Sequence, residues 1–147
     1  MEITFTMSLD SQQISTEELQ VFENTLNGLK LPEDYKHQML TCNGGNVDQY
    51  EIEHKNYIGE GIGIASFLPI KYGNYTLEKA KNNFMDRLPE GFVPIGHTTG
   101  NAGLLIMSLN NDQTYGHIKV RYTDGDIDDF SASFTDLLND MVEAEDY

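Results

Sequence analysis

Residues 31–47 read Leu-Pro-Glu-Asp-Tyr-Lys-His-Gln-Met-Leu-Thr-Cys-Asn-Gly-Gly-Asn-Val and predict a helix, a stop and a strand in one short run. Pro32 has a preset φ and no amide hydrogen, so it suits the first turn of a helix. An apolar stripe follows at helical spacing, formed by Tyr35, Met39 and Leu40. Gly44 and Gly45 then end the helix, because glycine adopts the left-handed backbone of a C-cap without steric cost.

Two later segments extend this pattern. The first is Leu-Pro-Glu-Gly-Phe-Val-Pro-Ile-Gly at 88–96, followed by Gly100-Asn101 and the apolar run Leu-Leu-Ile-Met at 104–107. The second is Phe-Ser-Ala-Ser-Phe-Thr-Asp-Leu-Leu at 130–138. With the Leu-Pro-x-Asp-Tyr-Lys and Asn-Gly-Gly motifs of the opening stretch, these segments make the chain resemble the SUKH superfamily, also called the Smi/Knr family.

This resemblance implies a single α+β domain over residues 1–147, with a core at about 15–142, in which helices flank an antiparallel sheet. Many members of the superfamily are immunity proteins that bind and block a cognate bacterial toxin domain, often a nuclease. Others are regulatory adaptors, as in the fungal cell-wall proteins. Both roles describe a non-enzymatic protein-binding module. The alternative of a different class is a small-ligand-binding domain or an enzyme that uses the open face of the sheet.

The charge of the chain narrows the classes of partner. Its 147 residues suit one domain, and 39% apolar with 22% charged residues is ordinary for a soluble globule. The formal net charge of −15 and the pI near 4.3 are not ordinary. Nucleic acids and anionic membrane surfaces would repel such a chain. The charge therefore favours a basic protein partner, such as a basic toxin domain, or serves solubility alone.

Three features of the sequence predict a cytoplasmic protein. No segment approaches the roughly 20 apolar residues that a membrane-spanning helix needs. The first seven residues lack the basic start and long apolar core of a secretory signal. Cys42 is the single cysteine, which excludes an intrachain disulfide and suits a reducing compartment.

Periodicity predicts three more helices. Ser15 and Glu18 form a capping box for a first helix that Gly28 ends. A third helix starts after a cap at Asn74 or Thr76 and stops before Pro89. The last spans 133–142 and has the strongest apolar stripe, formed by Phe134, Leu137, Leu138, Met141 and Val142.

Strands are predicted at 47–54, 62–68, 92–96, 104–109 and 117–122, the last two paired as a hairpin. Residues 1–9 alternate in polarity, which indicates either another strand or a disordered tail. An acidic turn at 124–129 leads into a short strand or loop before Ser131.

No pattern predicts a catalytic residue, a cofactor or a metal. The histidines are scattered singly, without the spacing of a zinc site: His37, His54, His97 and His117. The glycines of 59–63 lack the lysine and helix of a phosphate loop and indicate a hairpin turn or bulge. Residues 124–129 open like a calcium loop but lack its later ligands. Cys42 is predicted to be buried and unreactive at the negative end of a helix, where the dipole raises the thiol pKa.

Two acidic groups are the candidate binding residues. One surrounds the strand after the glycine stop and consists of Asp48, Tyr50, Glu51 and Glu53. The other is the turn that contains Asp124, Asp126, Asp128 and Asp129, after which the chain has no lysine or arginine. Carboxylates steer a basic partner, and tyrosine adds contact area at low entropy cost. The sequence therefore predicts a protein-binding face built from one or both groups.

Overall fold

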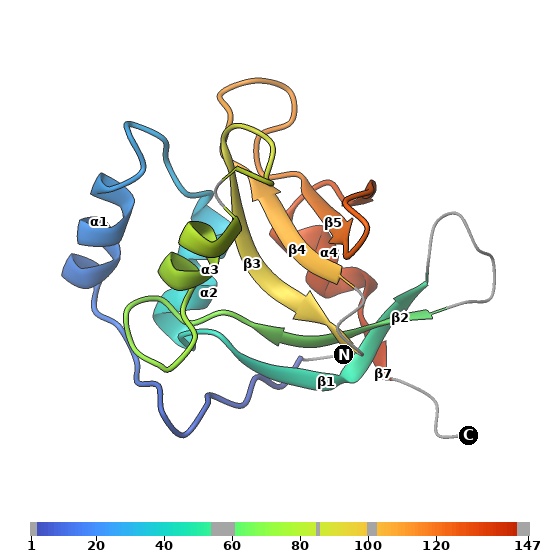
Figure 1. Ribbon diagram of the computed structural model, residues 1–147. Coiled ribbons are helices and arrows are strands. Elements are labelled where there is room, and N and C mark those ends of the chain that lie inside the picture. Colours follow the sequence, from blue (N-terminus) through green and yellow to red (C-terminus); the bar gives the residue numbers. More distant parts are fainter. Residues whose placement is uncertain (1–2, 54–60, 85, 100–102, 144–147) are drawn as a thin grey trace.

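The computed structural model describes residues 3–53, 61–84, 86–99 and 103–143 (Figure 1). Its helices are α1 (Thr16–Asn24), α2 (Glu33–Thr41), α3 (Leu77–Phe84) and α4 (Phe134–Asp140). Its strands are β1 (Gly45–Glu53), β2 (Gly61–Phe67), β3 (Phe92–Thr98), β4 (Gly103–Ser108), β5 (Ile118–Tyr122), β6 (Ile127–Ser131) and β7 (Val142–Glu143). The predicted α+β fold with flanking helices is confirmed.

The described strands form one antiparallel sheet in the order β6-β5-β4-β3-β2-β1-β7. From β1 to β6, each strand pairs with the next one along the chain. The last strand breaks this rule, because β7 returns to the far edge and pairs with β1. The C-terminal part of the chain therefore reaches both edges of the sheet, with α4 between β6 and β7.

Aromatic side chains join the helices to the sheet. Phe134 of α4 meets Tyr35 of α2 and Phe67 of β2 edge-on, with ring centroids 5.3 and 5.4 Å apart. In Figure 1, α4 lies behind β4, whereas α3 lies in front, beside β3. Leu77 and Ala80 of α3 are fully buried. Leu77 and Ala80 belong to the same hydrophobic core as Phe134, so α3 and α4 contribute to one core.

The opening stretch forms its helix but ends it in another way than predicted. Leu40 is 37% exposed, so the buried stripe of α2 consists of Tyr35 and Met39. The C-cap is Cys42, whose backbone is extended at φ −152°. Gly44 has φ +74° for a different reason: a Cβ there would lie 2.7 Å from both Phe67 O and Pro69 N. The glycine lets β1 approach the end of β2.

Residues 3–9 do not form the alternative strand considered for 1–9. Thr6 makes a single antiparallel bridge with Asn46, with N–O distances of 3.1 and 2.8 Å. The amide of Thr4 donates to the hydroxyl of Tyr50 at 3.0 Å. Farther along this edge, β1 pairs with β7 instead. The N-terminal segment therefore shares one edge of β1 with the C-terminal strand, and little length is left for ladder pairing.

The last predicted helix was too long. Met141 caps α4 with ψ +131°, which is an extended conformation, and the chain then enters β7. Val142 is consequently 53% exposed and lies opposite Glu51, not on the apolar face of a helix. Pairing with the free edge of β1 overrides the helical period here.

Smaller differences concern the other caps. The capping box of Ser15 and Glu18 is confirmed, but α1 ends at Asn24, well before Gly28. Thr76, not Asn74, caps α3, since its hydroxyl accepts the amide of Lys79 at 3.3 Å. Before Ser131 the chain forms a strand, β6, so that of the two alternatives the strand is correct.

Candidate protein-binding surface

The predicted acidic turn connects β5 and β6 and is held by backbone geometry. The amide of Tyr122 donates to Asp126 O at 2.8 Å, and the amide of Gly125 donates to Tyr122 O at 2.9 Å. Asp124 Oδ1 accepts the amide of Asp126 at 3.0 Å. Asp124 and Asp126 are exposed. The turn thus presents carboxylates on a closed hydrogen-bonded frame.

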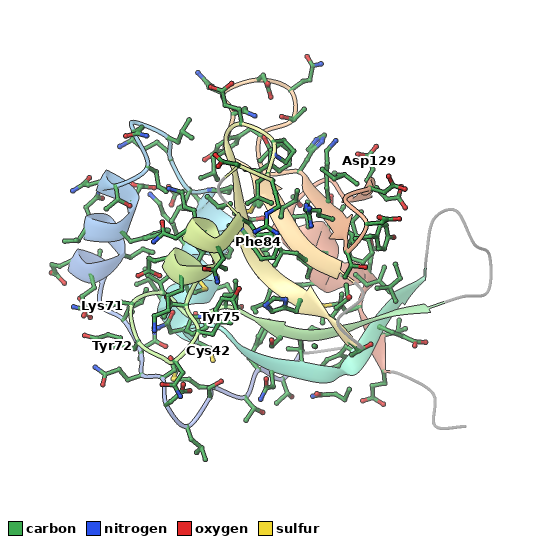
Figure 2. All side chains as sticks on the ribbon, viewed as in Figure 1. Cys42, Lys71, Tyr72, Tyr75, Phe84 and Asp129 are labelled. Atoms are coloured by element: carbon green, nitrogen blue, oxygen red, sulfur yellow. The ribbon has the colours of Figure 1, made fainter. Side chains whose placement is uncertain are left out.

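The edge strand β6 continues this acidic surface. Asp128 is half-buried, whereas the side chain of Asp129 is 82% exposed and forms a 3.0 Å salt bridge with Lys119 of β5. Figure 2 shows Asp129 at the outer margin of the molecule. An exposed salt bridge of this kind contributes little, about 0–1 kcal/mol. Asp129 is therefore an exposed carboxylate whose salt bridge with Lys119 adds little stability.

Helix α4 adds two further carboxylates on its outer face. Phe134 and Leu137 are buried beneath it, while Asp136 and Asp140 are exposed. The hydroxyl of Ser133 accepts the amide of Asp136 at 3.0 Å and so fixes the start of the helix. We call residues 124–143 the acidic C-terminal segment. Its carboxylates are those of Asp124, Asp126, Asp128, Asp129, Asp136, Asp140 and Glu143, and it contains no lysine or arginine.

The other predicted group lies on β1 and is less uniform. Tyr50 is 3% exposed, and its hydroxyl accepts the amide of Thr4, so it is a core residue without a contact surface for a partner. Glu51 points to the other side of the strand and is half-buried. The side chains of Asp48 and Glu53 lie outside the described part of the structure. The sequence pattern did not show that Tyr50 faces inward.

The two predicted acidic groups lie near opposite edges of the sheet, but strand β7 brings the end of the C-terminal group back to β1. In the strand order, β6 lies at one edge of the sheet and β1 is next to the other. Strand β7 nevertheless places Glu143 opposite Tyr50 and Val142 opposite Glu51. The acidic C-terminal segment therefore starts at the turn before β6 and ends beside β1, where Glu143 lies on the face of Tyr50 and Val142 on that of Glu51.

The other candidate residues have structural surroundings. Cys42 is half-buried, not fully buried as predicted, and its thiol donates to Gly44 O at 3.3 Å. Burial raises the pKa of this thiol, which disfavours the reactive thiolate. His37 lies in α2, His97 in β3 and His117 just before β5, while His54 falls outside the described residues. Within the described ranges, no group of three histidine, cysteine or acidic side chains is placed to hold a metal ion.

An antiparallel sheet, flanking helices and an acidic outer segment define an acidic α+β domain. Its sequence matches the SMI1/KNR4 family (SUKH-1) over residues 13–140, and the chain belongs to this family. The resemblance seen in the three motifs is thereby confirmed. Comparison with curated proteins and with solved structures gives no match. Among the helices that the structure describes, none is long and apolar enough to cross a membrane.

Proposed function

We propose that the chain is a non-enzymatic, cytoplasmic protein-binding module, an immunity protein that neutralises a cognate bacterial toxin domain. The observation that supports this most is the acidic C-terminal segment, which carries seven carboxylates and no lysine or arginine on a turn, β6, α4 and β7. A partner that binds it needs a basic surface. The phosphate-binding site of a nuclease has that character, so the carboxylates would occupy the place of nucleic-acid phosphates.

The placement of the carboxylates suits fast and specific association. A surface on which all charges are negative attracts a positively charged partner over roughly a Debye length, which is about 10 Å at 0.1 M salt. Most of the segment lies on regular elements or on a hydrogen-bonded turn, so little entropy is lost when a partner orders it. Charge complementarity therefore acts mainly on the association rate.

A regulatory adaptor of the Smi/Knr type would use the same surface for another partner. The two roles differ in the consequence of binding, since an immunity protein abolishes a toxic activity. Co-expression with a candidate toxin domain, sought in the genes next to the one for this chain, distinguishes them. Restored growth supports the immunity role, whereas binding without protection supports the adaptor.

The charge argument is tested by association rates with that toxin domain at low salt. One variant changes Asp124, Asp126, Asp128 and Asp129 to asparagine, which keeps size and turn preference. A second changes Asp48 to asparagine and Glu51 and Glu53 to glutamine. We expect at least one of them to associate about tenfold more slowly, and the difference to shrink as salt rises.

A matched control removes four exposed carboxylates elsewhere on the molecule, through amide substitutions at Glu17, Glu33, Asp86 and Glu90. This variant has the same net charge as the first one. If all three variants associate at the parent rate, phosphate imitation is wrong. If the control slows association as much as the others, the association rate depends on the net charge of the protein and not on a particular acidic surface.

A further inference from the structure

A cavity of about 290 Å³ lies on the sheet face that α3 partly covers. Its floor is a row of side chains across three neighbouring strands, because His97 pairs with Leu104 and Leu104 pairs with Arg121. Directly paired residues of adjacent antiparallel strands point to the same face of a sheet. Phe84, at the end of α3, and Arg87, just beyond it, line the cavity as well. Figure 2 shows Phe84 over the central strands.

The two arginines of the chain meet at this cavity. The guanidinium carbons of Arg87 and Arg121 lie 5.2 and 5.6 Å from the centre of the Phe84 ring. Arg121 Nε donates to Arg87 O at 3.2 Å, and Arg121 Nη1 donates to Tyr122 O at 3.3 Å. Arg87 Nη2 donates to Asn83 O at 3.0 Å. Backbone carbonyls and one aromatic ring therefore orient both cations toward one space.

Both arginines of a chain with a net charge of −15 thus lie at one place. Two guanidinium groups beside one ring repel each other. The attraction of each cation to the Phe84 ring, about 0.5–1 kcal/mol at exposed sites, offsets this repulsion only in part. A bound oxyanion would relieve the repulsion, since the planar fork of arginine matches carboxylate and phosphate oxygens. Burial lowers the pKa of His97, so the imidazole at the row's end is neutral near pH 7 and adds no third positive charge.

We propose that this cavity binds a small organic anion, whose carboxylate or phosphate group contacts Arg87 and Arg121 and whose apolar part lies against Leu104 and Phe84. The volume is at the lower end for ligand pockets, which favours a compact ligand. The cavity borders the acidic turn, because Thr123 also lines it, but its two cations lie outside the acidic C-terminal segment and it needs no protein partner. The cavity would thus bind an anion, whereas the acidic C-terminal segment would bind a basic partner.

The test is a titration of the isotope-labelled protein, followed by NMR, with phenyl phosphate, benzoate and neutral benzyl alcohol. We expect saturable shifts of the Leu104 and Arg121 amides with at least one anion, and none with the alcohol. The stronger of the two anions identifies the preferred oxyanion group. Arg121→Gln should weaken binding by about tenfold or more, since it removes charged hydrogen bonds.

Lys119→Gln is the matched control, because Lys119 lies two residues away on the same face of β5 but does not line the cavity. It should leave the affinity within about twofold of the parent. Arg87→Gln provides a second variant on an exposed residue if Arg121→Gln does not fold. The proposal is overturned if neither anion gives saturable shifts, if benzyl alcohol binds equally well, or if Lys119→Gln weakens binding as much as the arginine variants.

Discussion

At the scale of single residues, Asn43 does more than precede a pair of glycines. Its side chain is fully buried and hydrogen-bonds two distant segments. Nδ2 donates to Gln12 O at 2.9 Å and to Ile70 O at 2.8 Å, while Oδ1 accepts the amide of Ile70 at 2.8 Å. The amide of Asn43 itself donates to Gln13 Oε1 at 3.1 Å. One side chain thus fixes the N-terminal segment and the chain after β2 against the end of α2.

Asn43→Ala should therefore destabilise the protein by about 2–4 kcal/mol, because it leaves buried backbone groups of Ile70 without partners. Urea unfolding measures this difference in the free energy of unfolding. Asn139→Ala, at an exposed position of α4, is the control and should change stability by less than about 0.5 kcal/mol. Equal effects of the two substitutions would contradict the linking role of Asn43.

Replacing a glycine can cost stability through backbone strain or through a steric clash, and Gly28 and Gly44 distinguish the two. Both have a positive φ, of +74° and +89°. A Cβ on Gly44 would lie 2.7 Å from two backbone atoms, whereas nothing lies within 4 Å of one on Gly28. Gly28→Ala should cost about 1–2 kcal/mol from backbone strain alone. Gly44→Ala adds a clash that β2 cannot relieve, and should cost at least about 3 kcal/mol by chemical denaturation. A smaller loss for Gly44→Ala than for Gly28→Ala would show that the approach of β1 and β2 is looser than described.

At the scale of elements, Glu18 connects α1 to the segment before α3. Oε1 completes the capping box by accepting the amide of Ser15 at 3.0 Å. Oε2 accepts from Lys71 Nζ at 2.7 Å and from the Tyr72 hydroxyl. Figure 2 shows Lys71 and Tyr72 together on this side of the molecule. The Lys71 hydrogen bond, and then that of Tyr72, lower the pKa of Glu18 from 4.5 to about 2.

This lowered pKa makes part of the stability depend on pH. The carboxylate contributes fully above the unfolded value of 4.5, and its contribution is lost as the pH falls through that value toward 2. Glu18→Gln should therefore be less stable than the parent at pH 6, and the gap should narrow between about pH 4.5 and 2. Urea midpoints across this range measure it. Glu17→Gln, an exposed neighbour, is the control. A gap that stays constant with pH would mean that the ionised carboxylate contributes nothing.

The boundary between α4 and β7 gives a second test at this scale. Leu137 is fully buried, so Leu137→Ala should cost about 2–5 kcal/mol by opening a cavity under the helix. Val142 is 53% exposed in β7, so Val142→Ala should change stability by less than about 0.5 kcal/mol. Thermal or urea unfolding distinguishes these values. A large loss for Val142→Ala would instead support the longer helix that periodicity predicts.

At the scale of the whole molecule, the net charge of −15 opposes compaction through self-repulsion. Changing Asp124, Asp126, Asp128 and Asp129 to asparagine removes four of these charges. The lost Lys119–Asp129 salt bridge is exposed and worth at most about 1 kcal/mol. We expect the melting temperature to rise by about 2–4 °C at low salt, which corresponds to about 1 kcal/mol for a domain of this size. The rise should vanish near 1 M salt, where the Debye length is about 3 Å. A fall in melting temperature at low salt would show that the turn depends on its carboxylates.

The sequence by itself determined the features that depend on neighbouring residues. The capping box at Ser15, the helix after Pro32, the central strands and the family motifs all follow from local rules of capping, periodicity and turn chemistry. The acidic character of residues 124–143 is likewise a property of the sequence alone. The acidic turn predicted at 124–129 is shorter in the structure, where Asp124 and Asp126 are exposed in the turn and Asp128 and Asp129 already belong to β6.

Only the tertiary structure decided which distant segments meet. Local patterns do not encode which strand pairs with a free sheet edge. The pairing of β7 with β1 ended the last helix earlier than predicted and placed Val142 in a strand. The same pairing and the contact with Thr4 turned Tyr50 inward. The row formed by His97, Leu104 and Arg121 exists because three separate strands adopt one register. Strand register and side-chain burial depend on packing over the whole chain. For this reason the sequence patterns did not predict the cavity beside α3.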